Sequence, residues 1–212
     1  MKAGGPSGSP AFAVSGTKKR LRRRRRLRLA AASLILLAGL ALISYPFVSD
    51  WLNQRAQDAV SNTQQQTVAA LKPADLSAEK AKAEAYNAHL RDGSSRVVDP
   101  FDQDDASPGN DEYESVLNVA GDGVMAELII PSISVDLPIY HYTTEEPLSH
   151  GVGHVVNTSV PIGGDSTHSV LAGHTGLPTA RLFDRLDELK KGDWFIIRVL
   201  GEDHAYKVYS TE

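Results

Sequence analysis

The sequence predicts a mainly β domain that follows a membrane-spanning helix and a pair of further helices. Three observations support this prediction. An apolar run without charge occupies 29–48, helix-forming residues dominate 50–92, and short alternating runs separated by Gly, Pro and Asp fill 116–212. The composition, 42% hydrophobic and 23% charged, is typical of a folded protein and excludes a collagen-like or wholly disordered chain.

The first 48 residues are predicted to be a membrane anchor. Residues 1–17 are rich in Gly, Ser, Pro and Ala, and nine of the eleven residues in 18–28 are basic, so we expect 1–28 to be a disordered basic tail. The twenty residues of 29–48 would form a helix about 30 Å long, which matches the hydrocarbon core of a bilayer. Basic residues before the span predict a cytoplasmic N-terminus and an extracellular domain, with the lipid bilayer as a partner.

A cleaved signal peptide is the alternative interpretation of this segment. Its apolar part is usually about 7–15 residues long and ends at a small-x-small cleavage site. Residues 43–47, Ile-Ser-Tyr-Pro-Phe, offer no such site. An uncleaved anchor with a single span is therefore favoured.

Two helices and a long loop are predicted between the anchor and the β region, over 49–115. The helices are expected at about 50–71 and 75–91, with Pro73 at their boundary and Asp75 or Ser77 as N-cap candidates. Residues 93–115 lack periodicity and are rich in Gly, Ser, Pro, Asn and Asp. Loops of this length are usually lids, binding loops or linkers.

The region 116–212 has the pattern of short strands. Six runs are predicted as strands, at 125–130, 133–137, 152–156, 169–172, 194–200 and 204–209. We expect a sandwich or barrel, interrupted by one helix at 180–189. No closing strand follows the last run, which leaves an open edge and suggests that the chain is a shortened copy of a longer protein.

Charge and the absence of cysteine limit the possible functions. Residues 49–212 hold 12 basic and 26 acidic residues, a net charge of −14. A surface that binds nucleic acid needs a basic face, so nucleic acid is not expected as the main partner. The chain has no cysteine, and so it has no disulfide, no thiolate zinc site and no cysteine nucleophile.

Two short patterns are weak signals, one of a zinc site and one of a catalytic serine. His150 and His154 have the spacing of zinc ligands on a helix, but they lie near a Gly-rich predicted strand without an acidic third ligand, so we expect no metal. Gly164-Asp165-Ser166 could be taken for the turn of a serine hydrolase. That turn should join a strand to a helix, whereas this one leads into a strand.

His174 is the candidate catalytic residue. A short apolar run ends at Gly173, His174 follows at once, and turn-forming residues come next. The pattern places one imidazole at the mouth of a sheet, partly exposed and suited to general acid and base catalysis near neutral pH. A single histidine at a strand end is often structural, so this pattern alone leaves both roles open.

Several motifs occur together along the β region and the long loop. They are Ile129-Ile130-Pro131-x-Ile133-x-Val135-x-Leu137-Pro138-Ile139-Tyr140, Gly151-Val152-Gly153-His154, Thr158-Ser159-Val160-Pro161-x-Gly163-Gly164, Thr167-His168-Ser169, Gly173-His174-Thr175-Gly176-Leu177-Pro178, Leu182-Phe183, Lys191-Gly192-Asp193 and, in the loop, Asp99-Pro100-Phe101. Together they resemble the sortases, and specifically the pilus-assembling class C sortases, whose lid carries an Asp-Pro-aromatic motif. The resemblance covers roughly 50–212.

The resemblance implies an eight-stranded β-barrel with transpeptidase activity. Such an enzyme cleaves a Leu-Pro-x-Thr-Gly-like sorting signal between Thr and Gly, forms a thioacyl-enzyme and transfers the acyl group to an amine, in class C usually a pilin lysine. The implied partners are pilins or surface proteins that carry a sorting signal, and no cofactor is implied. His174 matches the histidine of the family, while Phe101 would cover its cysteine and Asp99 would pair with its arginine.

The chain departs from the family because the cysteine and the arginine belong to strands that would follow 204–209. We therefore expect this chain to be an inactive, truncated copy of an active parent enzyme. A non-catalytic, membrane-tethered barrel that binds pilins or organises their assembly is the alternative. A housekeeping sortase is a third possibility, disfavoured by the Asp99-Pro100-Phe101 motif.

Overall fold

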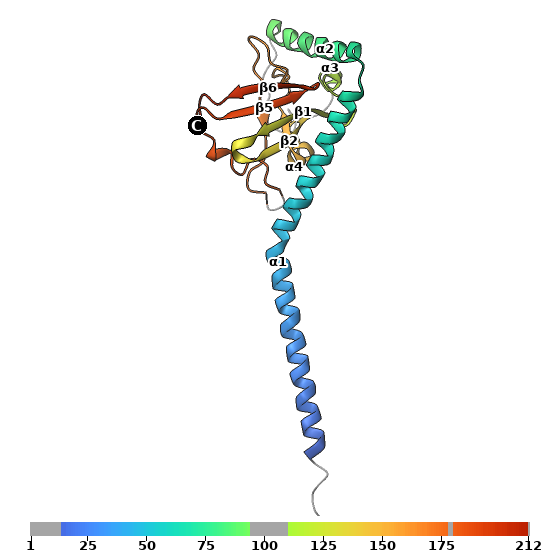
Figure 1. The fold of residues 1–212 in the computed structure, drawn as a ribbon, viewed down its shortest axis with the longest axis vertical. Helices are drawn as coiled ribbons and strands as arrows, with labels where there is room; N and C mark the ends of the chain where they lie inside the picture. Colours follow the sequence, from blue (N-terminus) through green and yellow to red (C-terminus); the bar gives the residue numbers. More distant parts are fainter. Residues whose placement is uncertain (1–13, 94–109, 178–179, 212) are drawn as a thin grey trace, which may run out of the picture. The chain divides into compact units, whose positions relative to one another are not determined.

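The structure is a computed structural model of the chain, and it describes residues 14–93, 110–177 and 180–211. The chain divides into two compact units, Met1–Pro46 and Phe47–Glu212. Helix α1, Val14–Ala70, begins in the first unit and ends in the second (Figure 1). The other helices and all strands belong to the second unit.

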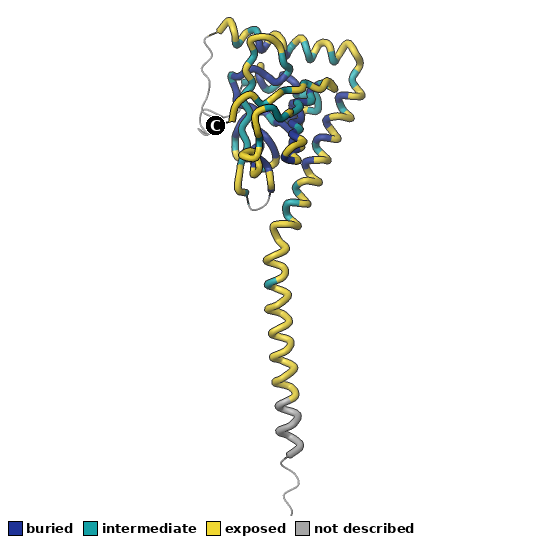
Figure 2. The backbone as a smooth tube through the Cα atoms, turned by 60° about the vertical axis from the view of Figure 1, so that its left-hand side comes forward, coloured by how far each residue is buried: buried dark blue, intermediate teal, exposed yellow. Residues whose placement is uncertain are grey.

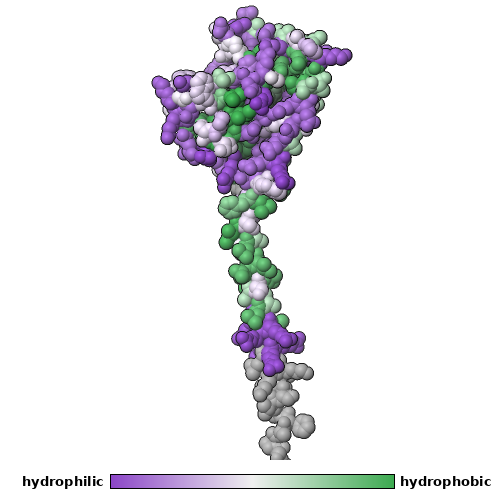
Figure 3. Space-filling view, in the orientation of Figure 1, coloured by the Kyte–Doolittle hydropathy of each residue, from purple (hydrophilic) through white to green (hydrophobic). Residues whose placement is uncertain are grey.

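The first unit contains a helix that is long and apolar enough to cross a membrane. Its large apolar side chains are exposed, with Ile35 at 72% and Leu42 at 76%, and Figure 3 shows a mainly apolar surface above the basic residues. The helix starts at Val14, so the part of the predicted tail from 14 to 28 is helical, not disordered. Lys, Arg and Leu are good helix formers, which accounts for the difference.

The second unit begins with the remainder of α1 and with α2, Pro73–Asp92. The predicted boundary at Pro73 is confirmed, but no break occurs near residue 50. Pro73 lies in the first turn of α2, where its missing N–H leaves no hydrogen bond unmade. The N-cap is Lys72, so the prediction of Asp75 or Ser77 as the cap was wrong. The Ser77 hydroxyl instead donates to the carbonyl of Pro73.

Six strands form one sheet, as the sequence pattern predicts. They are β1 Val124–Ile130, β2 Val135–His141, β3 Val152–His154, β4 Leu171–Ala172, β5 Trp194–Val199 and β6 Glu202–Lys207. Their order is β4-β3-β2-β1-β5-β6, and only the β2–β3 pair is parallel. Within the described residues the sheet does not close into a barrel, and β4 and β6 are its two edges.

The short elements α3 Asp111–Ser115 and α4 Glu145–His150 pack with this sheet. The core lies between the sheet, α2 and α3, and Figure 2 shows its buried residues gathered in the second unit. Tyr113 of α3 is fully buried, and its ring packs against those of Tyr86, His141, Tyr142 and His154. One aromatic side chain therefore joins α2 and α3 to strands β2 and β3.

The helix predicted at 180–189 was wrong. The segment contains only a 3-10 turn, Leu186–Glu188. The N–H of Phe183 donates to the carbonyl of His174, and the carboxylate of Asp184 accepts the N–H of Gly176. These contacts tie the segment to the loop before it and replace the hydrogen bonds that a helix would make within itself.

The predicted strand at 133–137 begins two residues later, at Val135. The residues before it, Pro131–Ile133, form a 3-10 turn that ends at Ser134 in the left-handed conformation. Apolar residues therefore continue to alternate across the turn, so their spacing alone does not show where the strand begins.

Candidate active site

His174 lies two residues beyond the end of edge strand β4. The strand pairs with β3, with Ala172 opposite Gly153, and Gly173 follows it. The ring of Phe183 lies against Gly173, and a Cβ atom on this glycine would lie 2.6 Å from Cδ2 of that ring. Gly173 is thus required by close approach, and together with the hydrogen bond from Phe183 N–H it fixes the backbone at His174.

The imidazole of His174 is partly exposed, as the sequence predicts for a general acid or base. Its side chain is 30% exposed, and Nε2 lies 3.8 Å from Oε2 of Glu145. Glu145 is the first residue of α4 and is itself 81% exposed. The contact is an ion pair only when the imidazole is protonated, and a pair so open to solvent is worth about 0–1 kcal/mol, so Glu145 orients the ring weakly.

Helix α4 holds Glu145 in place because its other face is buried. Pro147 and Leu148 are buried, and Gly151 N–H donates to the carbonyl of Pro147 where the helix meets β3. Strand β3 in turn pairs with β4, which leads to His174. No local motif in the sequence marks Glu145, because its contact with His174 spans 29 residues.

The arginines nearest to His174 along the chain are engaged elsewhere. Nε of Arg181 lies 3.5 Å from Asp50, and Arg185 pairs with Glu188 at 2.7 Å. Among the described residues, the imidazole therefore has a carboxylate beside it and no recorded contact with an arginine.

His150 and His154 do not form a pair of metal ligands. His150 is exposed on α4, whereas His154 is completely buried on β3. Nδ1 of His154 lies 2.7 Å from the Tyr113 hydroxyl and Nε2 lies 2.9 Å from the carbonyl of Ser159. A neutral ring that accepts at Nδ1 and donates at Nε2 fits these partners. Burial lowers the pKa of His154 to about 4, so the ring is structural and uncharged at neutral pH.

The remaining candidates are placed as follows. Gly164-Asp165-Ser166 is an exposed turn with Ser166 in the left-handed conformation, and no helix follows it. It is therefore not a nucleophile elbow. The predicted lid residues Asp99, Pro100 and Phe101 lie outside the described residues. Residues 14–93, 110–177 and 180–211 hold no group of three His, Asp or Glu side chains arranged to bind a metal ion.

Comparison with known proteins relates this fold to one family. The family model for the sortase domain matches residues 128–212. The crystal structure of sortase C-1 from Actinomyces oris is 46% identical, with 65% of this chain and 75% of that chain covered and a TM-score of 0.58. No curated protein matches the chain.

Two streptococcal structures are similar over a comparable length. Sortase C of Streptococcus pneumoniae, whose structure concerns catalysis and pilin substrate specificity, is 37% identical over 70% of this chain and 73% of that chain, with a TM-score of 0.63. Sortase C1 of Streptococcus agalactiae is 36% identical over 71% of this chain and 74% of that chain, with a TM-score of 0.60.

Proposed function

The chain belongs to the sortase family, and we propose that it supplies the anchor and the histidine-bearing part of a class C sortase that joins pilin subunits. The observation that carries the proposal is the position of His174. It follows an edge strand, its backbone is fixed by Gly173 and Phe183, and its side chain is partly exposed. A general acid and base needs this combination of fixed position and access to substrate.

In the proposed reaction His174 transfers protons and does not form a bond to the substrate. A cysteine thiolate attacks the Thr carbonyl of a Leu-Pro-x-Thr-Gly-like sorting signal, and the Thr–Gly C–N bond breaks as His174 gives its proton to the leaving amine. His174 then takes a proton from the incoming lysine amine, which displaces the thiolate and forms an amide bond. A thiolate is the required nucleophile, and this sequence contains no cysteine.

The cysteine and the arginine are therefore assigned to strands outside this sequence. The two open edges, β4 and β6, offer unpaired backbone groups to such strands. The side chains of Leu171, Phe195 and Tyr206 near these edges are only partly buried, so added strands would find apolar surface to cover. The proposal makes the 212-residue chain inactive and its parent active.

The proposal also includes a lid over the active site and an orientation in the membrane. The Asp99-Pro100-Phe101 segment acts as a lid, with Phe101 over the cysteine and Asp99 paired with the arginine. The apolar helix holds the protein in the membrane with its N-terminus in the cytoplasm and the second unit outside, as the basic residues before the span favour. Pilins that carry a sorting signal are the proposed substrates.

A hybrid protein tests the proposal. We would join this chain to the part of Actinomyces oris sortase C-1 that lies beyond the matched region, and measure joining of a sorting-signal peptide to a lysine peptide. His174→Ala should slow joining by about 10²–10⁴-fold, the usual contribution of a general acid or base. His168→Ala is the matched control, because His168 is exposed on the same segment, and it should leave the rate unchanged.

The result separates the proposed enzyme from the alternative. Near-normal joining by the His174→Ala hybrid would refute the assigned role. Failure of the unsubstituted hybrid to join peptides, although folded and able to bind pilin, would favour the non-catalytic scaffold instead.

A further inference from the structure

The side chain of Asp50, on helix α1, contacts the segment that fixes His174. Its Oδ1 accepts the backbone N–H of Arg181 at 3.0 Å, and its Oδ2 lies 3.5 Å from Nε of the same arginine. The Asp50 side chain is only 18% exposed. The two residues lie 131 positions apart in the chain, so the contact exists only in the folded protein.

The segment 180–183 connects this contact to His174. Its apolar side chains are buried in the core. The N–H of Phe183 donates to the carbonyl of His174 at 3.0 Å, and the Phe183 ring lies against Gly173. Only two positions therefore separate the N–H that Asp50 binds from the N–H that fixes the backbone of His174.

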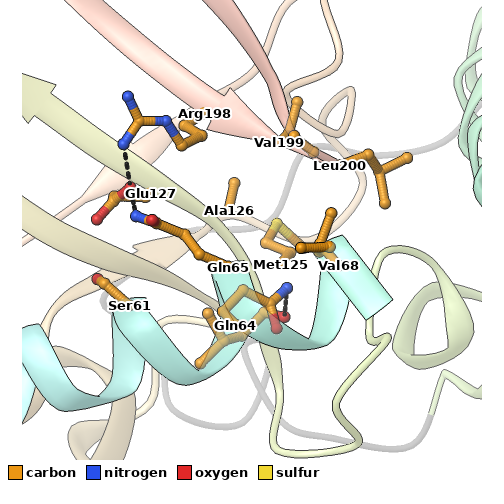
Figure 4. A pocket seen from close by; sticks show the side chains of 13 residues that line it. Ser61, Gln64, Gln65, Val68, Met125, Ala126, Glu127, Arg198, Val199 and Leu200 are labelled. Atoms are coloured by element: carbon orange, nitrogen blue, oxygen red, sulfur yellow. Dashed lines mark hydrogen bonds and ion pairs between the residues drawn. The ribbon is translucent and has the colours of Figure 1, made fainter. Parts of the chain in front are cut away.

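Asp50 belongs to a face of α1 that packs on the rest of the second unit. The buried residues of this face follow one another at intervals of three or four positions, and they are Gln57, Ser61, Gln64 and Val68. Asp50 precedes the first of them by seven positions, which is two helical turns. Figure 4 shows Gln64 and Val68 beside side chains of β1. The packed face thus begins two residues after the predicted span, 29–48.

The same face also supports α4. Nε2 of Gln57 donates to the carbonyl of His150 at 3.0 Å, where α4 ends. The first residue of α4, Glu145, lies beside His174. Two elements that adjoin His174, the segment 180–183 and α4, are therefore hydrogen-bonded to one helix.

We propose that Asp50 is a positioning residue, through which α1 holds the segment 180–183 and so keeps His174 in place. The hydrogen bond from the Arg181 N–H is the part of the contact that acts. A hydrogen bond to a carboxylate is roughly twice as strong as one between neutral groups. The Arg181 side chain is 61% exposed, so its ion pair with Asp50 adds little.

The hold on the segment does not depend on transpeptidation, but its importance for catalysis rests on the proposed function. Two measurements separate these points. The first follows the segment in the chain itself, and the second follows the reaction of the hybrid.

Hydrogen exchange of the Phe183 amide measures the hold directly. The full chain in detergent micelles, labelled with 15N at its five phenylalanines, gives few amide signals, and Phe183→Leu identifies that of Phe183. Phe195 on β5 reports the stability of the sheet. Asp50→Ala should speed exchange at Phe183 by at least about tenfold relative to Phe195, because only the segment loses a tie.

Two further variants separate positioning from loss of charge. Asp50→Asn keeps an acceptor oxygen for the Arg181 N–H, so exchange at Phe183 should stay within about threefold of wild type. Asp58→Ala removes a carboxylate from an exposed position on the same helix and should change this exchange by less than about twofold.

Three results would overturn the proposal. Unchanged exchange at Phe183 in Asp50→Ala would show that the segment does not need the contact. Equal acceleration at Phe183 and Phe195, or unfolding of the variant, would show a general structural role. Equal acceleration by Asp58→Ala would show an effect of charge alone.

The hybrid with the Actinomyces oris C-terminal part measures the consequence for catalysis. His174 moves protons in the proposed reaction and does not bind the sorting signal. Asp50→Ala should therefore lower kcat by about 10–10²-fold and change KM by less than about threefold, and Asp50→Asn should keep most of the rate. A raised KM with unchanged kcat would contradict the positioning of His174. An inactive unsubstituted hybrid would refute the proposed function, while the exchange measurement would still decide the role of Asp50.

Discussion

The hydroxyl of Tyr113 lies 2.7 Å from Nδ1 of His154, and both side chains are completely buried. The contact joins α3 to β3, whose neighbour β4 leads to His174. Complete burial disfavours the charged imidazole and lowers the pKa of His154, so the pair forms with a neutral ring. Stability of the second unit is therefore coupled to pH through His154.

The first prediction concerns this coupling. Because the pKa of His154 falls from its usual 6.5 to about 4 on folding, the unfolded chain binds the extra proton below pH 6.5. The stabilisation is present above pH 6.5 and is lost as the pH falls toward 4, by roughly 3 kcal/mol. Denaturant unfolding measured from pH 7.5 to 4 should show this slope in wild type and a smaller slope in His154→Gln.

The exposed His150 supplies the control for that experiment. His150→Gln lies four residues away and should leave the pH slope unchanged. An unaltered slope in His154→Gln would mean that other groups control the acid sensitivity.

Asp136 should have the opposite dependence on pH. Its pKa is raised to about 6 by burial and by Glu127, so the native state holds a proton that the unfolded state has lost above pH 3.8. The stabilisation is full below pH 3.8 and is lost as the pH rises through 6. Asp136→Asn should therefore stabilise the protein at pH 7.5, on the order of 1 kcal/mol because solvent screens this only partly buried carboxyl, and have little effect at pH 4. Destabilisation at pH 7.5 would argue against repulsion by Glu127.

Gly173 should be sensitive to the addition of a single methyl group. Gly173→Ala brings Cβ to within 2.6 Å of the Phe183 ring, and such overpacking typically costs about 1–3 kcal/mol. Thermal unfolding measures the loss. In a Phe183→Leu background, Gly173→Ala should cost less than it does in wild type, because the ring that the new methyl group meets is gone. Full stability of Gly173→Ala would show that the loop moves freely and that His174 is not held as described.

The anchor prediction is topological. With an N-terminal epitope on the chain in intact protoplasts, added protease should remove residues after 48 and leave the epitope protected, because the basic residues before the span favour the cytoplasmic side. Loss of the epitope in intact protoplasts with survival of the folded unit would show the reverse orientation.

Much of the fold follows from local sequence patterns. Alternation and turn residues locate all six strands, and Pro73 marks the boundary between the two helices, because each signal acts over a few residues. The helix predicted at 180–189 does not form. The composition of the segment favours a helix, but its hydrogen bonds go to His174 and Gly176. Tertiary contacts outweigh propensity at this point.

The site is less predictable than the fold. A glycine and a histidine after an apolar run mark His174, but its neighbour Glu145 comes from a helix 29 residues earlier. The contacts of Glu127 with Gln65 and Arg198 join three elements, and each residue is separated from the next by more than 60 positions. No spacing in the sequence predicts such contacts, because the order of strands in the sheet creates them.

Under the proposed function this chain carries the histidine but not the cysteine nucleophile of a sortase. Intact-mass measurement after mixing with a sorting-signal peptide tests it most directly, since a thioacyl-enzyme is heavier by the mass of the acyl fragment. The hybrid with the Actinomyces oris C-terminal part should gain this mass at its cysteine, and the 212-residue chain should gain none. An acyl adduct on the 212-residue chain, or a folded hybrid that forms none, would contradict the account.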